Sequence, residues 1–221
     1  MKKIFLIIPV YNESKVLKET LEEIKQYGYD KIIVVDDGSS DDSFDIARKE
    51  CLALKLEINR GKGAAVKTGI EAAKKLGADV VVTLDGDGQH NPKDIKKMLQ
   101  LINDKYDVVL GSRLKNPQGM PWYKIMHNQI GNFFTWIIYG LWVSDSQSGF
   151  RAYSRKAIDL IDTKTDRYEY DSEIIREIKK HKLSYTEIPI EVRYTQYSMN
   201  KKNKQNFING IKTLIKMLIY S

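Results

Sequence analysis

Thr83-Leu84-Asp85-Gly86-Asp87-Gly88-Gln89-His90 is the stretch around which the rest of the sequence can be interpreted. The apolar run from Val80 to Val82 leads into it and is typical of a buried strand. Two carboxylates one residue apart follow, and glycines then interrupt the strand pattern. The stretch therefore predicts a strand whose carboxyl end brings two acidic side chains to one small volume.

Further apolar runs occur before and after this strand, with helical periodicity between them. Strands are predicted at residues 4–10, 31–35, 52–58, 79–84 and 107–110. Helices are predicted from Ser14, which can cap the first of them, to Tyr27, then through Phe44 to Ala47, from Gly63 to about Leu76, and after Asn91-Pro92. This alternation predicts an α/β fold, with a mainly parallel, Rossmann-like sheet and helices on both faces.

Polar clusters follow four of the predicted strands. They are Tyr11-Asn12-Glu13, Asp36-Asp37, Asp85-Gly86-Asp87 and Ser112-Arg113. Ligands of open α/β sheets bind along the carboxyl ends of the strands, so these clusters indicate one shared binding edge.

The second half of the sequence is less regular. A predicted helix from Tyr123 to Val143 is apolar nearly all round and rich in aromatic residues, which is typical of either a buried helix or one at a membrane interface. A polar turn at 145–151 leads into a short strand, a helix is predicted at 171–180 and a strand at 183–192. Residues 203–220 have the pattern of an amphipathic helix. We expect one domain over 1–221, with a core at about 4–194 and a basic tail at about 195–221.

Composition sets limits on the class of protein. The 221 residues are 42% hydrophobic and 29% charged, which is typical of a soluble globular protein. A single cysteine, Cys51, excludes an internal disulfide and favours a reducing compartment. The longest nearly apolar run, Phe133 to Val143, is shorter than the about 20 residues that a spanning helix needs.

Positive charge gathers at the carboxyl end. Six of the 36 Lys and Arg residues, but none of the 29 Asp and Glu residues, lie in 192–221, so the rest of the chain is almost neutral. Such a tail can meet nucleic acid, an anionic membrane or a phosphorylated ligand, or it can be a solvated helix face.

The polar clusters differ in the chemistry they allow. Asp85 and Asp87 offer hard oxygen ligands that suit Mg²⁺ or Mn²⁺. Asp36 and Asp37 can accept hydrogen bonds from a ribose or a base, or help to begin a helix. The glycine-lined start of a helix at Arg60-Gly61-Lys62-Gly63 can favour an anion, although it lacks the Walker spacing.

As a set, these motifs resemble the inverting family 2 glycosyltransferases of GT-A fold, and most closely the dolichyl- or polyprenyl-phosphate sugar transferases. The likeness covers about residues 4–194. The matching stretches are Ile8-Pro9-Val10-Tyr11-Asn12-Glu13, Asp36-Asp37-Gly38-Ser39-Ser40-Asp41, Asn59-Arg60-Gly61-Lys62-Gly63, Asp85-Gly86-Asp87-Gly88-Gln89-His90, Gly111-Ser112-Arg113 and Asp145-Ser146-Gln147-Ser148-Gly149-Phe150-Arg151.

The resemblance implies a set of roles for individual residues. A nucleotide-sugar donor would be held by Pro9, Tyr11, Glu13, Asp37, Lys62, Asp85, Gly86 and Arg193, the last at its diphosphate. Mg²⁺ or Mn²⁺ would be bound by Asp85, Asp87 and Gln89. Arg113 would bind the phosphate of a polyprenyl or dolichyl phosphate acceptor. Asp145 would act as a base or position the donor sugar, and Asp87, Arg113 and Asp145 together would form the catalytic set.

Two departures from the family pattern bear on the acceptor. Where lipid-phosphate members often carry a second arginine, the nearest cation here is Lys124, which lacks a bidentate fork. Many relatives also continue into transmembrane helices, and this sequence stops at Ser221. The resemblance therefore implies a cytoplasmic protein bound peripherally to the cytosolic face of the cell membrane, with no role for nucleic acid.

Other functions remain open from the sequence. A family 2 enzyme that glycosylates a carbohydrate or cell-surface acceptor is the main alternative, and a non-catalytic nucleotide-binding scaffold is a lesser one. A sugar-1-phosphate nucleotidyltransferase is disfavoured because its glycine-rich N-terminal signature is missing. Gln147 resembles glucosyl and N-acetylglucosaminyl members, which favours a UDP-sugar over GDP-mannose. The oligomeric state is not readable from the sequence.

Overall fold

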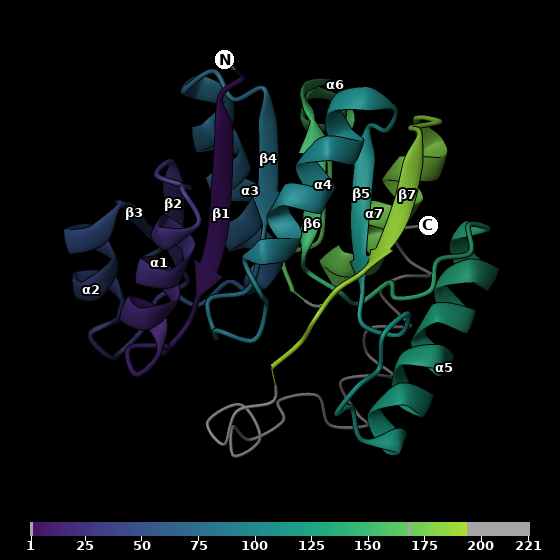
Figure 1. Ribbon diagram of the computed structural model, residues 1–221, viewed down its shortest axis with the longest axis horizontal. Helices are drawn as coiled ribbons and strands as arrows, with labels where there is room; N and C mark the ends of the chain where they lie inside the picture. The colour runs from purple at the N-terminus through teal and green to yellow at the C-terminus, as the bar shows by residue number, and fades with distance from the viewer. Residues whose placement is uncertain (1, 168, 194–221) are drawn as a thin grey trace.

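Seven strands form one sheet within residues 2–167 and 169–193, the part of the chain that this computed structural model describes. Their order across the sheet is β3-β2-β1-β4-β6-β5-β7 (Figure 1). The strands are β1 (Ile4–Val10), β2 (Ile32–Asp36), β3 (Leu52–Lys55), β4 (Val80–Thr83), β5 (Val108–Ser112), β6 (Arg151–Ser154) and β7 (Tyr185–Pro189). The helices are α1 (Leu17–Gln26), α2 (Ser43–Glu50), α3 (Lys62–Lys75), α4 (Lys93–Asp104), α5 (Trp122–Tyr139), α6 (Arg155–Leu160) and α7 (Glu169–Lys180).

The sheet is parallel except at β6. β1 pairs in parallel with β2 and β4, and β5 pairs in parallel with β7. β6 runs antiparallel between β4 and β5, with Val82 opposite Ala152 and Val109 also opposite Ala152. The predicted mainly parallel α/β sheet is therefore confirmed.

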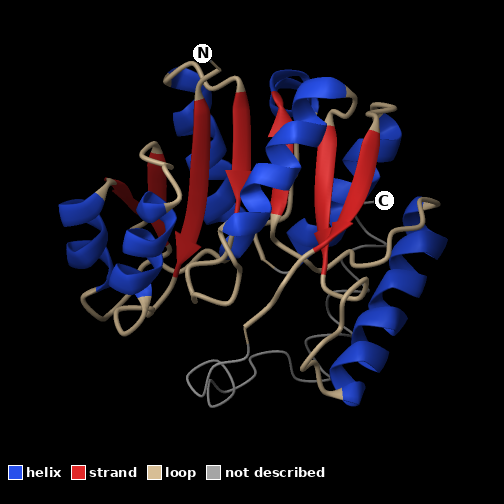
Figure 2. Ribbon diagram, in the orientation of Figure 1, coloured by secondary structure: helices blue, strands red, loops and turns tan. Residues whose placement is uncertain are grey.

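Helices cover both faces of the sheet (Figure 2). Helices α1, α2 and α4 pack on one face, against side chains such as Leu6 and Ile8 of β1. Helices α3, α6 and α7 pack on the other face, against Ile7. Because successive β1 side chains enter opposite cores, the strand is apolar without alternation, as is usual for a strand buried on both faces.

Several element boundaries differ from the predicted ones. The third strand stops at Lys55 rather than near residue 58. Ser14 does not cap the first helix, which begins at Leu17 after Val16 without a side-chain cap, and the Ser14 N–H donates to Asp41 Oδ2 at 3.1 Å. The predicted aromatic helix ends at Tyr139, since Gly140 takes a left-handed conformation with φ of 64°. The predicted C-terminal amphipathic helix lies outside the described residues.

Helix α5 turns polar side chains toward the protein and large apolar side chains outward, the reverse of an ordinary amphipathic surface helix. It packs beside α7 and buries Asn128, Asn132 and Thr135. Its outward side exposes large apolar side chains, so it is neither of the fully buried type nor an ordinary surface helix. We call this side the α5 apolar face; it consists of Trp122, Tyr123, Met126, Ile130, Phe133, Trp136 and Ile137.

The opposite, amino-terminal edge of the parallel strands carries no comparable cluster of strand-end motifs among the described residues. A depression of about 440 Å³ there is lined by residues that include Lys2, Asp79, Asp107 and Lys156. Lys156 and Asp107 pair with each other at 3.0 Å.

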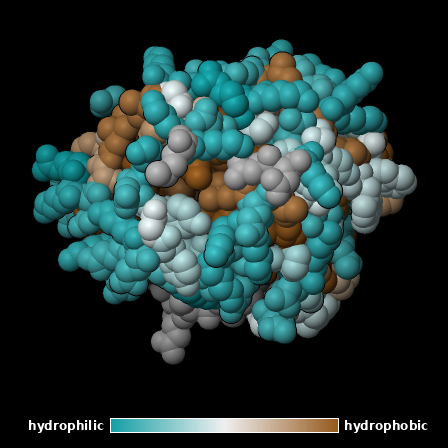
Figure 3. Space-filling model, turned by 45° about the horizontal axis from the view of Figure 1, so that its top comes forward, coloured by the Kyte–Doolittle hydropathy of each residue, from teal (hydrophilic) through white to brown (hydrophobic). Residues whose placement is uncertain are grey.

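The view in Figure 3 shows a mostly hydrophilic surface with separate hydrophobic areas. Among the helices that the structure describes, none is long and apolar enough to cross a bilayer.

Candidate active site

The two predicted carboxylates lie directly beyond β4, where the chain turns sharply. The Asp85 N–H donates to His90 Nδ1 at 3.2 Å, and this bond closes the turn. Gly86 lies so close to β1 that a Cβ on it would come within 2.5 Å of Val10 Cγ1. The glycine is therefore needed to place Asp85 and Asp87 at the carboxyl edge of the sheet.

Asp85 is paired with a lysine from α3. Lys62 Nζ lies 2.7 Å from Asp85 Oδ1 and 3.5 Å from Asp171 Oδ2. Burial opposes charge on Lys62, but the carboxylates of Asp171 and Asp85 outweigh it and raise the lysine pKa above its usual value. Burial likewise opposes the charged form of Asp85, yet Lys62 holds the carboxyl pKa well below its usual range. Both groups are therefore charged at neutral pH.

Asp87 lies beside Gln89 in the same turn. The Gln89 N–H donates to Asp87 Oδ1 at 3.1 Å, and the Gln89 amide donates to Asp87 Oδ2. His90 is buried and stacks on Phe150, with ring centroids 5.0 Å apart. Burial lowers the pKa of His90 despite the nearby carboxylates. Its neutral ring supports the turn by accepting a hydrogen bond.

Arg113 and Asp145 form a bidentate ion pair. Arg113 Nε lies 2.7 Å from Asp145 Oδ2, and the Arg113 Nη2 atom lies 2.8 Å from Asp145 Oδ1. The Arg113 backbone N–H also donates to Asp145 Oδ2 at 2.9 Å. The Asp145 side chain is fully buried, whereas that of Arg113 is 25% exposed. The buried carboxylate of Asp145 thus fixes the partly exposed guanidinium of Arg113 at the surface of the site.

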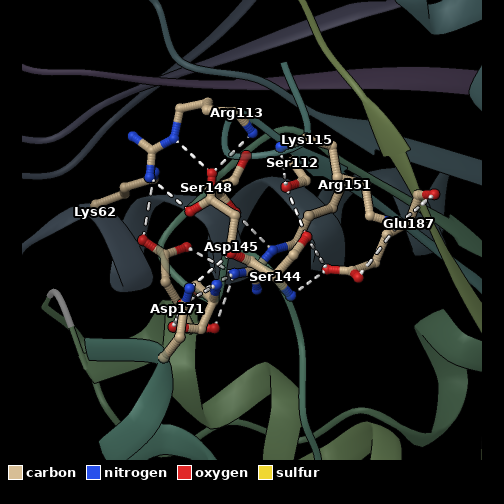
Figure 4. Close-up of polar contacts among 12 residues, drawn as sticks. Lys62, Ser112, Arg113, Lys115, Ser144, Asp145, Ser148, Arg151, Asp171 and Glu187 are labelled. Carbon is tan, nitrogen blue, oxygen red and sulfur yellow. Dashed lines mark hydrogen bonds and ion pairs between the residues drawn. The ribbon is translucent and has the colours of Figure 1, made fainter. Parts of the chain in front are cut away.

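A hydrogen-bonded group supports this pair from the side of β7. Ser144 donates to Glu187 Oε1 through both its N–H and its hydroxyl, at 2.7 and 2.8 Å. Ser144 Oγ also lies 2.7 Å from Ser112 Oγ. Figure 4 shows Lys62, Arg113, Asp145 and Asp171 in one polar cluster with this group beside it.

The predicted nucleoside-binding residues gather at the ends of β1 and β2. Pro9 belongs to the end of β1, Tyr11 follows it, and Glu13 is buried. Asp37 accepts hydrogen bonds from the N–H groups of Arg60 and Gly61, each at 2.8 Å. Burial raises the Asp37 pKa in spite of these bonds. Asp37 therefore holds the loop before α3 against the end of β2.

Two predicted cations lie at the margins of this arrangement. The guanidinium of Arg193 binds both carboxylate oxygens of Glu23 in α1, each at 2.8 Å, and the Arg193 N–H donates to Gln89 O at 2.9 Å. Lys124 lies in the first turn of α5, at the far end of the loop that begins at Arg113. The structure thus brings together Lys62, Asp85, Arg113 and Asp145, while Arg193 is engaged with α1.

The sequence interpretation missed Asp171, and it gave no role to Gly149 or His90 although both lie in the motifs that it identified. Asp171 resembles an ordinary acidic residue in the first turn of a helix, and it is the fold that places α7 under Lys62. Gly149 is held against β4 because its carbonyl accepts a 2.7 Å hydrogen bond from Thr83 Oγ1. His90 lies three residues after Asp87, and this closeness in the sequence is the signal by which its role could have been found. Cys51 has no part in the cluster, and burial raises its thiol pKa to about 11.

The fold defines a class of protein: an α/β protein of GT-A type, here with acidic side chains beyond a central strand. The chain belongs to the glycosyl transferase family 2, because residues 5–161 match the sequence model of that family. The family expected from the sequence motifs is therefore confirmed.

Similar proteins are known from archaea and bacteria. The chain is 43% identical to an uncharacterized protein of Methanocaldococcus jannaschii, over 98% of this chain and 91% of the relative. It is 40% identical to the UDP-N-acetylglucosamine–dolichyl-phosphate N-acetylglucosaminyltransferase of Methanococcus voltae, over 99% of this chain and 96% of that one. Glucosyl-3-phosphoglycerate synthase from Mycobacterium tuberculosis, solved with Mn²⁺, uridine diphosphate and phosphoglyceric acid, has a TM-score of 0.72 at 16% identity, over 98% of this chain and 78% of the solved one. That likeness concerns the fold alone.

Proposed function

We propose that the protein transfers a sugar from a nucleotide sugar to dolichyl or polyprenyl phosphate, with inversion at the anomeric carbon. The observation that carries the proposal is the arrangement at the sheet edge, where the Asp85 and Asp87 motif lies beside an arginine held by a buried carboxylate. The first feature suits a nucleoside diphosphate and the second suits an acceptor phosphate. The relative from Methanococcus voltae favours UDP-N-acetylglucosamine as donor and a dolichyl phosphate as acceptor.

The acceptor supplies its own nucleophile in this reaction. A phosphate oxygen of the lipid attacks the anomeric carbon, and the bond from that carbon to the nucleoside diphosphate breaks. Because the attacking oxygen is already anionic, no base is required, and Asp145 serves to hold Arg113 against the acceptor phosphate. Catalysis then rests on positioning and on stabilisation of charge.

The residues at the β4 turn fit a divalent cation such as Mg²⁺ or Mn²⁺. Asp85, Asp87 and Gln89 offer hard oxygen atoms, and the ammonium of Lys62 on Asp85 shows that positive charge is accommodated there. Among the described residues, no group of three or more His, Cys, Asp or Glu side chains could hold a metal alone. The protein would therefore share the ion with phosphate oxygens of the donor, where it would offset charge on the leaving diphosphate.

The remaining predicted roles belong to the same proposal. Pro9, Tyr11, Glu13 and Asp37 would hold the nucleoside, with Gly86 allowing close approach of the chain. Lys124 would add a second contact to the acceptor phosphate. Arg193 could reach the diphosphate only after leaving Glu23, so its role depends on a rearrangement of that pair.

A lipid acceptor requires contact with a membrane, and the α5 apolar face suits it. This face exposes 71% of Trp122 and 57% of Ile137, while the opposite side of the helix makes polar contacts inside the protein. Aromatic rings are favoured at the interface between headgroups and acyl chains. The protein would bind peripherally at the cytosolic face, with the α5 apolar face against the lipid.

A direct assay tests the proposal. The purified protein is incubated with Mg²⁺ or Mn²⁺, a short polyprenyl phosphate and a panel of UDP- and GDP-sugars, and the lipid product is analysed by mass spectrometry. Asp87→Ala should lose the product, whereas Asp45→Ala, in an exposed ion pair with Arg48, should retain it. Nucleotide release without a glycolipid would move the acceptor to a carbohydrate. No turnover with any donor would favour the scaffold alternative.

A further inference from the structure

Lys62 occupies the position on Asp85 that a divalent cation would need. Its ammonium is 2.7 Å from Asp85 Oδ1, which is the distance of a charge-assisted hydrogen bond. A second carboxylate, Asp171, holds the same ammonium from the side of α7 at 3.5 Å. The Lys62 side chain is 23% exposed, so it can leave this position toward the open edge of the site.

The position of the ammonium depends on a glycine. A Cβ on Gly149 would lie 2.2 Å from Lys62 Nζ and 3.0 Å from Asp85 Oδ1. Gly149 cannot easily retreat, because its carbonyl accepts the 2.7 Å hydrogen bond from the buried Thr83 hydroxyl. The chain therefore leaves a space beside Asp85 that only an unsubstituted backbone provides, and Lys62 fills it.

Resting on the proposed function, we propose that Lys62 is an internal counter-cation that makes metal binding depend on the nucleotide. In the donor-free protein, the ammonium neutralises Asp85 and repels a divalent ion. A nucleoside diphosphate brings anionic oxygens that give Lys62 a new partner, so the lysine leaves Asp85 as the ion arrives. Free metal ions thus bind poorly, and the metal and the donor enter together.

Binding of Mn²⁺, measured from the free-ion signal in electron paramagnetic resonance with and without uridine diphosphate, tests this inference. Lys62→Met and Lys62→Gln remove the charge. Each should tighten nucleotide-free Mn²⁺ binding by at least about tenfold, because a unit charge is removed within a few ångströms of the ion. The nucleotide should then improve Mn²⁺ binding less than it does in the unmutated protein. Lys67→Met is the matched control, since Lys67 lies on the same helix and pairs with Asp166 instead.

The outcomes separate this inference from the function on which it rests. Unchanged or weaker nucleotide-free binding in both neutral variants, with normal Mn²⁺ binding by the unmutated protein in the presence of uridine diphosphate, would overturn the role of Lys62 alone. If the unmutated protein bound no Mn²⁺ even with uridine diphosphate, the metal-dependent function would fail, and the inference with it.

Discussion

Asp145 has both carboxylate oxygens engaged by Arg113, with the backbone N–H of Arg113 adding a third bond to Oδ2. A carboxylate bound in this way is poorly placed to take a proton from a substrate. It is well placed to fix the direction of a guanidinium, which binds phosphate in a fork geometry. The sequence motif suggested that Asp145 is a base or positions the donor sugar, whereas its contacts suggest that it positions Arg113.

A double-mutant cycle distinguishes these two roles. Asp145→Asn should lower kcat/KM for the lipid phosphate by about 100-fold, because it leaves a partly buried guanidinium without its partner charge. Arg113→Ala should cost at least as much, and the double variant should be little worse than Arg113→Ala. Effects that multiply would contradict this view and favour an independent role for Asp145. Asp159→Asn, in an exposed pair with Arg155, is the matched control.

At the scale of residues, the sequence revealed the groups that follow strands but not their partners. Asp85, Asp87 and Arg113 could be found because each lies within three residues of the end of an apolar run. The contacts of Lys62 with Asp171, and of Arg113 with Asp145, join residues 109 and 32 positions apart. Local patterns contain no information about such distances, and only the packing of α7 and the turn before β6 sets them.

Helix α5 is the element whose environment was left open by its sequence. Its aromatic content fitted a core as well as an interface. The structure excludes a fully buried helix, because Asn132 accepts hydrogen bonds from the Ser146 N–H and hydroxyl on the inner side, and Phe133 is 47% exposed on the outer side. An inward polar side and an outward apolar side suit a helix whose outer neighbour is lipid.

Charge placed on the α5 apolar face should weaken membrane binding. Phe133→Glu or Ile137→Glu should each reduce binding to vesicles that contain anionic phospholipid by about tenfold. Each would place a charge where an apolar side chain would otherwise be buried in the lipid. Leu76→Glu is a matched control, because Leu76 is 46% exposed at the end of α3. Vesicle flotation measures the effect. Equal flotation of all three variants and the unmutated protein would contradict a lipid-facing α5.

At the scale of elements, β6 shows the limit of sequence patterns most clearly. A short strand after the polar turn was predicted, but its four residues gave no sign of its direction or neighbours. Its antiparallel place between β4 and β5 rests on pairing with strands that lie far from it in the sequence. The parallel strands β1 and β4, in contrast, are apolar runs separated by helices, and that alternation is enough to predict a parallel sheet, although not the order of its strands.

For the whole molecule, paired carboxylates link stability to pH. Burial opposes the charged forms of Asp41, Asp107, Asp166 and Glu177, but hydrogen bonds and neighbouring cations lower the pKa of each. A group with a lowered folded-state pKa adds stability above its unfolded pKa of about 4, and that stability is lost as the pH falls through the folded value. Asp37, with a raised pKa, acts in the opposite direction.

The melting temperature should therefore fall as the pH is lowered from 5 to below 3. For a chain of this size, each 1 kcal/mol lost lowers the melting temperature by about 2–4 °C. Glu177→Gln should lower the stability at pH 6 and make its decline with acid less steep, whereas Glu57→Gln, at an exposed position, should change neither. Calorimetry at a series of pH values provides the measurement. A melting temperature that stays constant between pH 5 and 3 would contradict the expectation.

The place of β6 in the sheet also affects the order in which the strands can pair while the protein is being synthesised. Within the described sheet, β5 pairs only with β6 and β7, and both are translated after it. Strands β1 to β4 can pair among themselves as soon as residue 83 has emerged, so Asp85 and Asp87 follow a strand that can already be complete. Arg113 stays in an unpaired segment until Asp145, its ion-pair partner, and β6, which begins at Arg151, have left the exit tunnel. In a nascent chain, β1 to β4 and the turn with Asp85 and Asp87 can therefore form first, whereas the pair of Arg113 and Asp145 can form only after residue 145 has left the exit tunnel.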